Sequence, residues 1–189
     1  PLLGAGLYAA SKGVTLKATR LMALALAFST AYLGFGLGSR MVAEHRFQAA
    51  LNAQGIQASE VRAVPMAFNS LVWRVLAKAP GGIYYEGVSS LFDRGPPEMQ
   101  RLTRHLPLAE VLANDPLHQR LRWFTDDWLR YDQVGRTLVV TDLRMGTPGN
   151  YSFRFDFAQL DDQGQWVIQA PTAHQAGGPG SMFNRHDLA

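Results

Sequence analysis

The chain of 189 residues contains no cysteine. This absence excludes disulfide bonds, metal sites built from thiolates and a cysteine nucleophile. Three other catalytic signatures are also missing from the sequence: a paired-histidine H-E-x-x-H motif, a G-x-S-x-G nucleophile elbow and a glycine-rich phosphate loop. The closely spaced Gly34 and Gly36 do not form such a loop, because they lie inside an apolar segment.

Histidines are few, and their spacing is not that of a metal site. A protein-bound metal needs three or four ligands in a fixed geometry, and no histidine here has neighbours at ligand spacing. We therefore predict surface histidines, and no metal or other cofactor held by this chain itself. The five residues are His45, His105, His118, His174 and His186.

Charge is missing from residues 21–39. The run Leu21–Gly38 has 18 uncharged, mostly apolar residues, which as a helix would span about 27 Å, close to the hydrocarbon thickness of a bilayer. A charge at the centre of such a helix would cost about 2.5 to 3.5 kcal/mol. We predict a transmembrane helix over about 21–39.

Two alternatives to a transmembrane helix exist for this run. A helix that is apolar all round could be the buried core helix of a soluble protein, but it would need protein on every side, and the rest of the chain is small for that. A secretory signal peptide would have an apolar core of about 7 to 15 residues and a small-residue cleavage site. The run is longer, and no such site closes it cleanly.

The basic character of the chain is confined to its first part. Residues 1–55 hold five Lys and Arg against one acid, whereas residues 56–189 hold thirteen against fourteen. The basic excess therefore flanks the apolar run, where it sets orientation and contacts lipid, and it does not form a stripe for nucleic acid. Because Lys12, Lys17 and Arg20 precede the run without an acid, we expect the N-terminus in the cytoplasm.

The chain divides by composition into a membrane segment with a helical stalk (1–55), an extramembrane α+β domain (56–170) and a flexible tail (171–189). The chain starts without Met on an apolar stretch, so we interpret it as the C-terminal portion of a longer membrane protein. Gly34 and Gly38 form a small-xxx-small pair that lets another helix approach closely, either an upstream helix of the same protein or a second copy.

Hydrophobic periodicity gives the fold class of the extramembrane part. Alternating runs on either side of Pro80–Gly82 predict a hairpin, and further strands follow from about residue 137. Between them, Asp115-Pro116 predicts a helix start, with Leu117, Leu121, Phe124 and Trp128 on one apolar face. We predict an α+β fold: one transmembrane helix with a helical stalk, then a mostly antiparallel sheet of about five strands with a helical insertion.

A few polar residues interrupt otherwise apolar strands. Asp142 and Arg144 are two apart and project from the same strand face, while Asn69 and Arg74 lie close together upstream. Arginine presents a planar fork of donors that can orient an anionic group, so these four residues are our candidates for accessory substrate binding. The alternative is that Asp142 and Arg144 form an ion pair that supports the sheet.

These segments resemble the C-terminal half of the bacterial membrane-bound metal-dependent hydrolases, the YdjM-like inner-membrane proteins, over roughly residues 21–160. The resemblance implies an inner-membrane protein with several N-terminal helices and hydrolase activity that depends on a divalent metal in the full-length protein. The family's metal ligands lie in a His-containing N-terminal segment that nothing here matches, so no catalytic or metal-binding residue is assigned. The matching segments are Ser29–Gly34, Pro65-x-x-Phe68-Asn69-x-Leu71-x-Trp73-Arg74-Val75, Tyr84–Gly87, Ser90-Leu91-x-Asp93, Trp123-Phe124, Thr141–Gly146 and Tyr151-x-Phe153-Arg154-Phe155.

Two functions follow as expectations. In the first, the chain is the C-terminal portion of a membrane-bound metal-dependent hydrolase, with an accessory extramembrane domain on the periplasmic side of the bacterial inner membrane. In the second, it is a non-enzymatic membrane-tethered module for binding or assembly. Both predict the lipid bilayer as a partner, the first adds other transmembrane helices of the same protein, and neither involves nucleic acid.

Overall fold

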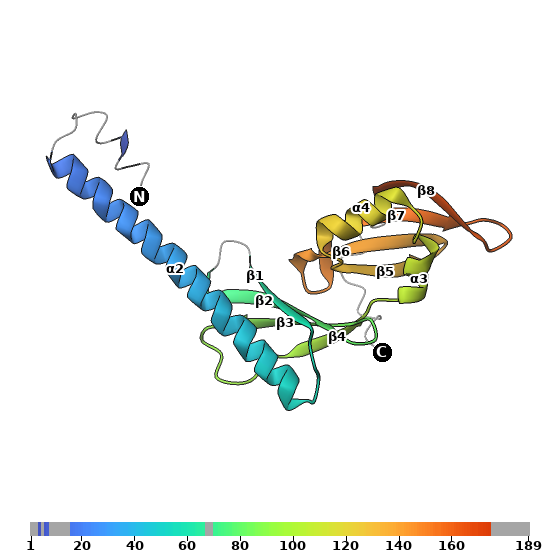
Figure 1. Cartoon of the computed structure of the whole chain (residues 1–189), viewed down its shortest axis with the longest axis horizontal. Helices are drawn as coiled ribbons and strands as arrows, with labels where there is room; N and C mark the ends of the chain where they lie inside the picture. Colours follow the sequence, from blue (N-terminus) through green and yellow to red (C-terminus); the bar gives the residue numbers. More distant parts are fainter. Residues whose placement is uncertain (1–3, 5, 8–15, 67–69, 175–189) are drawn as a thin grey trace, which may run out of the picture. The chain divides into compact units, whose positions relative to one another are not determined.

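The computed structural model describes residues 4, 6, 7, 16–66 and 70–174. It confirms the α+β class, with one long helix followed by two antiparallel four-stranded sheets, as Figure 1 shows. The predicted helical insertion is minor, because two short helices separate the sheets. The elements are α2 (Leu16–Ala53), β1 (Glu60–Pro65), β2 (Val72–Ala79), β3 (Ile83–Ser90), β4 (Met99–Thr103), α3 (Leu106–Val111), α4 (Pro116–Thr125), β5 (Leu129–Val134), β6 (Thr137–Thr147), β7 (Asn150–Leu160) and β8 (Trp166–Ala173).

Helix α2 unites the apolar run and the stalk in 38 residues. By length and composition it can cross a membrane, and only 6% of its apolar window is buried. The large side chains of the run, including Leu24, Phe28 and Leu33, are exposed. The buried core helix therefore does not describe this segment, since a core helix would be covered by protein on every side.

The last turns of α2 pack against the first sheet. Phe47 and Leu51 are fully buried and form one apolar cluster with Val75 and Ala77 of β2. Polar contacts add to this packing, because the Glu44 carboxylate accepts a hydrogen bond from the backbone N–H of Ala63 at 3.0 Å. The stalk is thus part of the body that carries β1 and β2.

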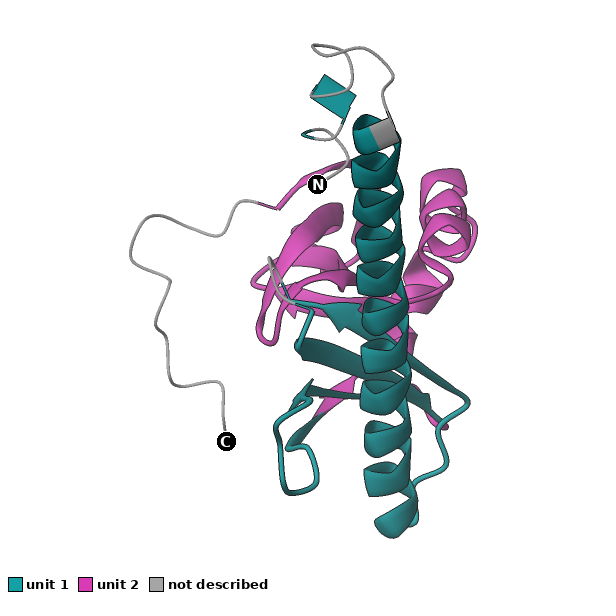
Figure 2. Cartoon of the chain, turned by 90° about the vertical axis from the view of Figure 1, so that its left-hand side faces the viewer, with its two compact units in different colours: residues 1–79, 85–100 teal, residues 80–84, 101–189 magenta. Residues whose placement is uncertain are grey.

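The chain forms two compact units, drawn in different colours in Figure 2. Unit 1 comprises residues 1–79 and 85–100, and unit 2 comprises residues 80–84 and 101–189. The predicted division differs from this one, since the stalk before residue 55 shares a core with the first sheet and the predicted 56–170 domain contributes to both units. The strand β8 extends to Ala173, so residues 171–173 are strand and not tail, and the rest of the predicted tail from 175 lies outside the described residues.

The predicted hairpin is present as β2 and β3, with Gly81 and Gly82 at φ 75° and 71° in the turn. Only glycine adopts this left-handed conformation without strain. Farther along β3, Gly87 lies where a side chain has no room: a Cβ there would be 2.3 Å from the Glu98 carbonyl oxygen and 2.8 Å from the Phe47 ring. This glycine allows helix α2 and the chain before β4 to approach β3 closely.

In unit 2 the sheet has the order β5-β6-β7-β8, and α3 and α4 contribute to the core on one of its faces. That core contains Leu129 and Tyr131 of β5 and Phe157 of β7. Trp128 follows α4 and does not continue it; the indole is fully buried and stacks on Tyr84, with ring centroids 5.6 Å apart. Trp128, the last of the four residues predicted to share one helical face, therefore lies outside the helix.

Candidate binding surface around helix α4

Helix α4 begins as its sequence predicts. The Asp115 side chain accepts a hydrogen bond from the backbone N–H of His118 at 2.7 Å, and Pro116 occupies the first helical turn. Aspartate at this position satisfies a helix donor that has no intrahelical partner, and proline there loses no hydrogen bond. The start of the helix is therefore fixed by two consecutive residues.

The end of α4 is a tight corner held by ion pairs. Asp126 and Asp127 have φ values of 53° and 58°, a left-handed conformation that is strained for residues other than glycine. The Asp127 carboxylate receives Arg122 Nε at 2.8 Å and Arg104 Nη2 at 2.5 Å. The Tyr84 hydroxyl donates to the Asp127 carbonyl oxygen at 2.8 Å. These contacts hold a strained backbone in place.

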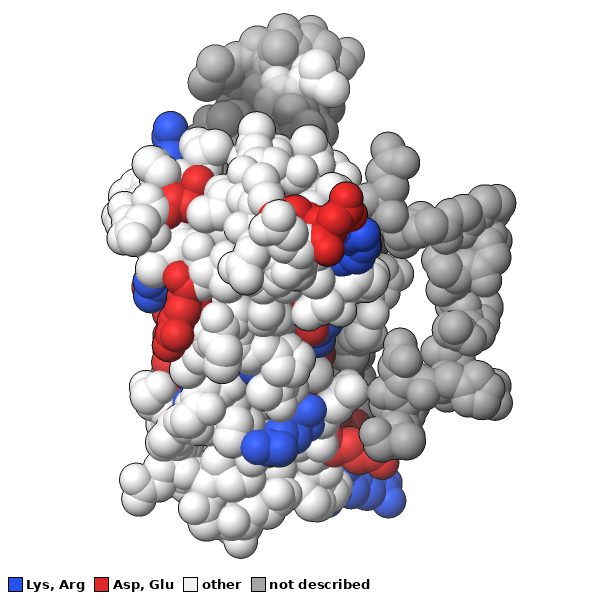
Figure 3. Space-filling view, turned by 90° about the vertical axis from the view of Figure 1, so that its right-hand side faces the viewer, with Lys and Arg blue, Asp and Glu red and all other residues white. Residues whose placement is uncertain are grey.

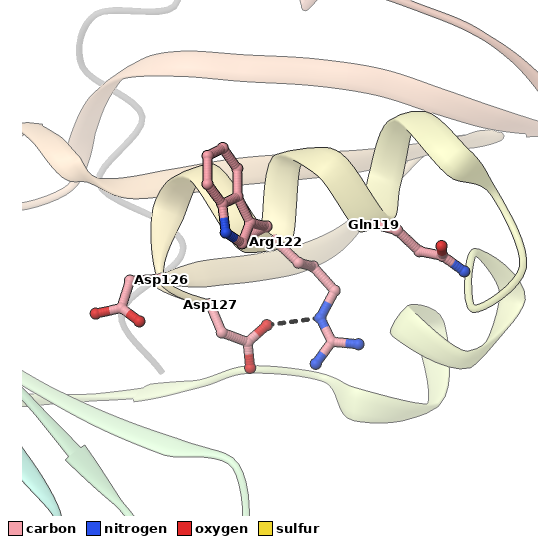
Figure 4. A pocket seen from close by; sticks show the side chains of 5 residues that line it. Gln119, Arg122, Asp126 and Asp127 are labelled. Atoms are coloured by element: carbon pink, nitrogen blue, oxygen red, sulfur yellow. Dashed lines mark hydrogen bonds and ion pairs between the residues drawn. The ribbon is translucent and has the colours of Figure 1, made fainter.

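A polar pocket of about 330 Å³ lies beside this corner and is lined by Gln119, Arg122, Trp123, Asp126 and Asp127. In Figure 4 the Arg122 guanidinium is turned toward Asp127, while the Asp126 carboxylate points away from that pair. Burial alone would raise the pKa of Asp127, but hydrogen bonds from Arg122 and Arg104 outweigh it and lower the pKa. Asp127 therefore stays ionised and paired, which does not suit a general acid or base.

An apolar groove of about 310 Å³ lies along α4. Trp123 and Phe124 beside it are 81% and 65% exposed, whereas the residues that α4 buries are His118 and Thr125. Leu117, Leu121 and Phe124 therefore share one apolar face, as predicted, and this face lines an open groove. The groove is lined by Leu117, Arg120, Leu121, Trp123, Phe124, Phe155, Phe157 and Pro171.

Asp142 and Arg144, two of the four predicted substrate-binding residues, adjoin this surface. Arg144 Nη2 lies 2.8 Å from Asp142 Oδ2 in an ion pair, so the alternative pairing within the sheet is present. Arg144 Nη1 also donates to the Phe124 carbonyl oxygen at 2.9 Å, and its guanidinium lies over the Phe124 ring at 5.0 Å. The pair therefore fastens the end of α4 to strand β6, and a substrate-binding role for it stays a prediction.

The other two predicted residues belong to unit 1. The Arg74 side chain is 1% exposed, and its Nε donates to Glu86 Oε1 inside the unit. The Arg74 guanidinium thus forms an ion pair with Glu86 inside unit 1. Asn69 lies outside the described residues. Arg74 is not a member of the surface around α4, since that surface is built from residues of unit 2.

Two histidines differ from the surface residues that the sequence predicts. His118 is buried, with Nδ1 2.8 Å from the Leu112 carbonyl oxygen and Nε2 2.9 Å from the Tyr131 hydroxyl. Burial lowers the pKa of His118, so the ring is a neutral part of the core. His174 follows β8, and its Nδ1 lies 2.5 Å from Asp156 Oδ1. Among the described residues, no group of three or more His, Asp or Glu could hold a metal ion.

Sequence reasoning missed the exposed aromatic pair, although one signal was available. Trp123 and Phe124 are adjacent, so a helix cannot turn both into one core. On the face shown in Figure 3, described Lys and Arg are interspersed with Asp and Glu and do not form a stripe. No family model, no curated protein and no solved structure matches this chain. The functional inference therefore rests on helix α2 and on the surface around α4.

Proposed function

We propose that the chain is a membrane-tethered binding module that docks on the lipid surface through the α4 surface, defined by Leu117, Trp123 and Phe124. The observation that carries this proposal is the exposure of Trp123 and Phe124 beside an apolar groove, in a chain whose helix α2 is long and apolar enough to cross a bilayer. Tryptophan is enriched at membrane interfaces because its ring is apolar and its N–H is polar.

A tether to the membrane favours the lipid surface as the partner of the α4 surface. Burying a large apolar side chain contributes about 1.5 to 3 kcal/mol, which for three side chains is a weak contact between free partners. A membrane-spanning helix would make docking intramolecular and so raise the effective lipid concentration. Arg120 lines the groove and supplies a cation suited to lipid phosphates. A small apolar patch would therefore suffice for a domain that is already held at the membrane.

We also propose the side of the membrane on which the two units lie. The basic residues ahead of the apolar run favour an N-terminus in the cytoplasm, which places both units on the periplasmic side of a bacterial inner membrane. Gly34 and Gly38 support contacts with other transmembrane helices of the same protein, since small residues four positions apart let a second helix approach closely.

The family resemblance supports a second candidate function, an accessory domain of a membrane-bound metal-dependent hydrolase. The segments Asn69–Arg74 and Asp142–Gly146 carry it in combination. In that protein the α4 groove would hold the apolar part of a lipid-like substrate, and the divalent metal would be bound by other segments. A His and Asp cluster among apolar spans upstream of Pro1 in the gene would support this function. An initiator Met directly before Pro1 would overturn it.

The absence of cysteine allows a sharp test of docking. Leu117→Cys would give the full chain a single thiol in the groove while keeping Trp123 and Phe124, and Asp162→Cys would label the exposed β7–β8 turn as a matched control. With an environment-sensitive fluorophore in anionic phospholipid vesicles, spin-labelled lipids should quench the probe at 117 several-fold more than the probe at 162. Adding Trp123→Ser should reduce that difference.

Two outcomes would overturn lipid docking. Equal quenching of the probes at 117 and 162 would show that the groove does not face lipid. Quenching at 117 that is unchanged by Trp123→Ser would show that the aromatic surface does not carry the contact. A groove that instead cross-links to a protein, with no quenching by lipid, would also reject the lipid surface as its occupant.

A further inference from the structure

We propose that the pocket lined by Arg130, Arg154 and His174, on one face of the second sheet, is a binding site for a phosphate-type oxyanion. This site goes beyond the function proposed above. Arg154 adjoins Phe155 in strand β7, and successive strand residues point to opposite faces of a sheet. The oxyanion site and the apolar groove therefore use different faces of β7 and different residues.

Strand register places the site residues in one row. Arg130 of β5 pairs with Thr141 of β6, and Thr141 pairs with Arg154 of β7. His174 continues the row, since its backbone N–H donates to the Arg154 carbonyl oxygen at 2.8 Å. Directly opposed residues share one sheet face at Cβ distances of about 5 Å. Two arginines and a threonine from three strands, and the histidine that follows β8, are thus gathered in one row.

The row lies at a polar pocket of about 320 Å³. Its size exceeds that of a bare phosphate ion and suits a small phosphorylated molecule. Backbone and side-chain donors of the β6–β7 turn complete the rim, and the Arg130 guanidinium lies over the Tyr151 ring at 5.3 Å. The pocket is lined by Arg130, Gly149, Asn150, Tyr151, Ser152, Arg154 and His174.

Two of the three basic side chains already have carboxylate partners. Arg130 Nε lies 2.8 Å from Asp132 Oδ2, and His174 Nδ1 lies 2.5 Å from Asp156 Oδ1. These pairs fix both side chains in position at the pocket. They also neutralise charge, so the pocket is not a general cation cluster, and its attraction for an anion depends on the remaining basic side chain, Arg154.

Arg154 is the unsatisfied member of the row. Its Nε is buried and has no hydrogen-bond partner among the described residues, and the same holds for the hydroxyl of Thr141, which lies directly opposite it in the sheet. Buried polar atoms are almost always hydrogen-bonded, so two neighbouring exceptions need an explanation. Because Arg154 also lines the pocket, an oxyanion bound there would compensate the charge of its guanidinium.

The chemistry of the donors selects the ligand class. Arginine offers parallel N–H groups that match two oxygens of a phosphate, and it stays charged at any physiological pH. A hydroxyl group such as that of Ser152, which lines the pocket, can donate to a third oxygen. A phosphate group is therefore the best fit, whether on a soluble phosphoester or on a lipid headgroup.

The first test measures binding of inorganic phosphate to the full chain in phosphatidylcholine nanodiscs by calorimetry. Hydrogen bonds to a charged group correspond to about a ten- to hundredfold change in affinity, so Arg154→Gln should weaken phosphate binding by about that factor. Arg136→Gln is the matched control, because Arg136 is an exposed arginine of the same unit that pairs with Asp162 away from the pocket. It should leave phosphate binding unchanged.

A second variant separates binding from folding. Arg154→Lys keeps the charge and most of the stem but loses the fork, so it should fold and bind phosphate with intermediate affinity. Repeating the titration in nanodiscs that contain phosphatidic acid identifies the source: loss of phosphate binding indicates a lipid headgroup, and unchanged binding indicates a soluble phosphoester. Two results would overturn the site. Either both Arg154 variants would bind phosphate with wild-type affinity, or chloride would bind the wild-type chain as tightly as phosphate does. Neither result depends on the groove at α4.

Discussion

At the scale of single residues, the chain keeps its buried charges in pairs. Arg74 and Glu86 are both nearly inaccessible, on neighbouring strands of the first sheet. Taking two charges out of water is costly, and their attraction offsets that cost only while both are present. The pair therefore acts as a constraint on how β2 and β3 pair.

Removing one member of this pair should destabilise unit 1 strongly. Arg74→Met leaves the Glu86 carboxylate buried without its ion-pair partner, and such changes typically cost about 3 to 5 kcal/mol. The double variant Arg74→Met with Glu86→Leu should recover much of the loss. Thermal unfolding of the detergent-solubilised chain, followed by circular dichroism, measures both. A single variant as stable as wild type would show that the pair contributes little, and would return Arg74 to consideration as a ligand-binding residue.

His118 makes stability depend on pH. Its Nδ1 faces the Leu112 carbonyl and its Nε2 faces the Tyr131 hydroxyl, an arrangement that the neutral ring satisfies. Because burial lowers the folded-state pKa, the unfolded chain takes up a proton below about pH 6.5 that the folded chain does not. The contribution of the neutral His118 ring to the free energy of unfolding is complete above that pH. It falls as the pH drops toward the folded-state pKa, by at most about 1.4 kcal/mol per pH unit.

The matching measurement compares urea unfolding at several pH values for wild type and His118→Gln. The difference between the two should shrink as the pH falls from 7 to 5. His45→Gln, at an exposed position of α2, is the control and should run parallel to wild type. A constant difference between His118→Gln and wild type would show that the buried ring does not titrate in this range.

At the scale of elements, sequence pattern gave the parts with strong local signals. Asp115-Pro116 set the start of α4, and the glycines after Pro80 set the β2–β3 turn, because both depend on neighbouring residues only. Strands β4 and β5 were not predicted, since their sequences lack clear alternation. The exposed face of α4 was missed, because periodicity shows which side is apolar but not whether another element covers it. The adjacency of Trp123 and Phe124 was the one available signal.

Gly87 offers a test of packing between elements. A Cβ at this position would meet the Glu98 carbonyl oxygen at 2.3 Å, so Gly87→Ala must push the chain before β4 away from β3. Overpacking of this kind typically costs about 1 to 3 kcal/mol. Gly95→Ala, where a Cβ meets nothing within 4 Å, is the control and should leave the melting temperature unchanged. Equal melting temperatures for both variants would contradict the close approach.

At the scale of the whole molecule, the chain combines one exposed apolar helix with two compact units. The sequence predicted the helix because an uncharged run is a local property. It could not predict that the chain divides into two units, because the division depends on which strands pair over long distances. The candidate site shows the same limit: Asp142 and Arg144 were visible as a same-face pair, but their contact with Phe124 required the fold.

Helix α2 gives the last prediction. Phe28 is exposed near the middle of the apolar run, and if the run crosses the bilayer, Phe28→Arg would place a charge in the hydrocarbon at a cost of about 2.5 to 3.5 kcal/mol. The variant should therefore shift from the carbonate-resistant membrane fraction toward the soluble fraction, whereas Gln48→Arg, in the stalk, should not. The proposed orientation, with the N-terminus in the cytoplasm, predicts that in spheroplasts a membrane-impermeant maleimide labels Asp162→Cys without permeabilisation. Labelling that requires permeabilisation would reverse the orientation. If the wild-type chain were found entirely in the soluble fraction, helix α2 would not be a membrane anchor. The small aromatic surface would then lack the tethering that makes it sufficient for docking.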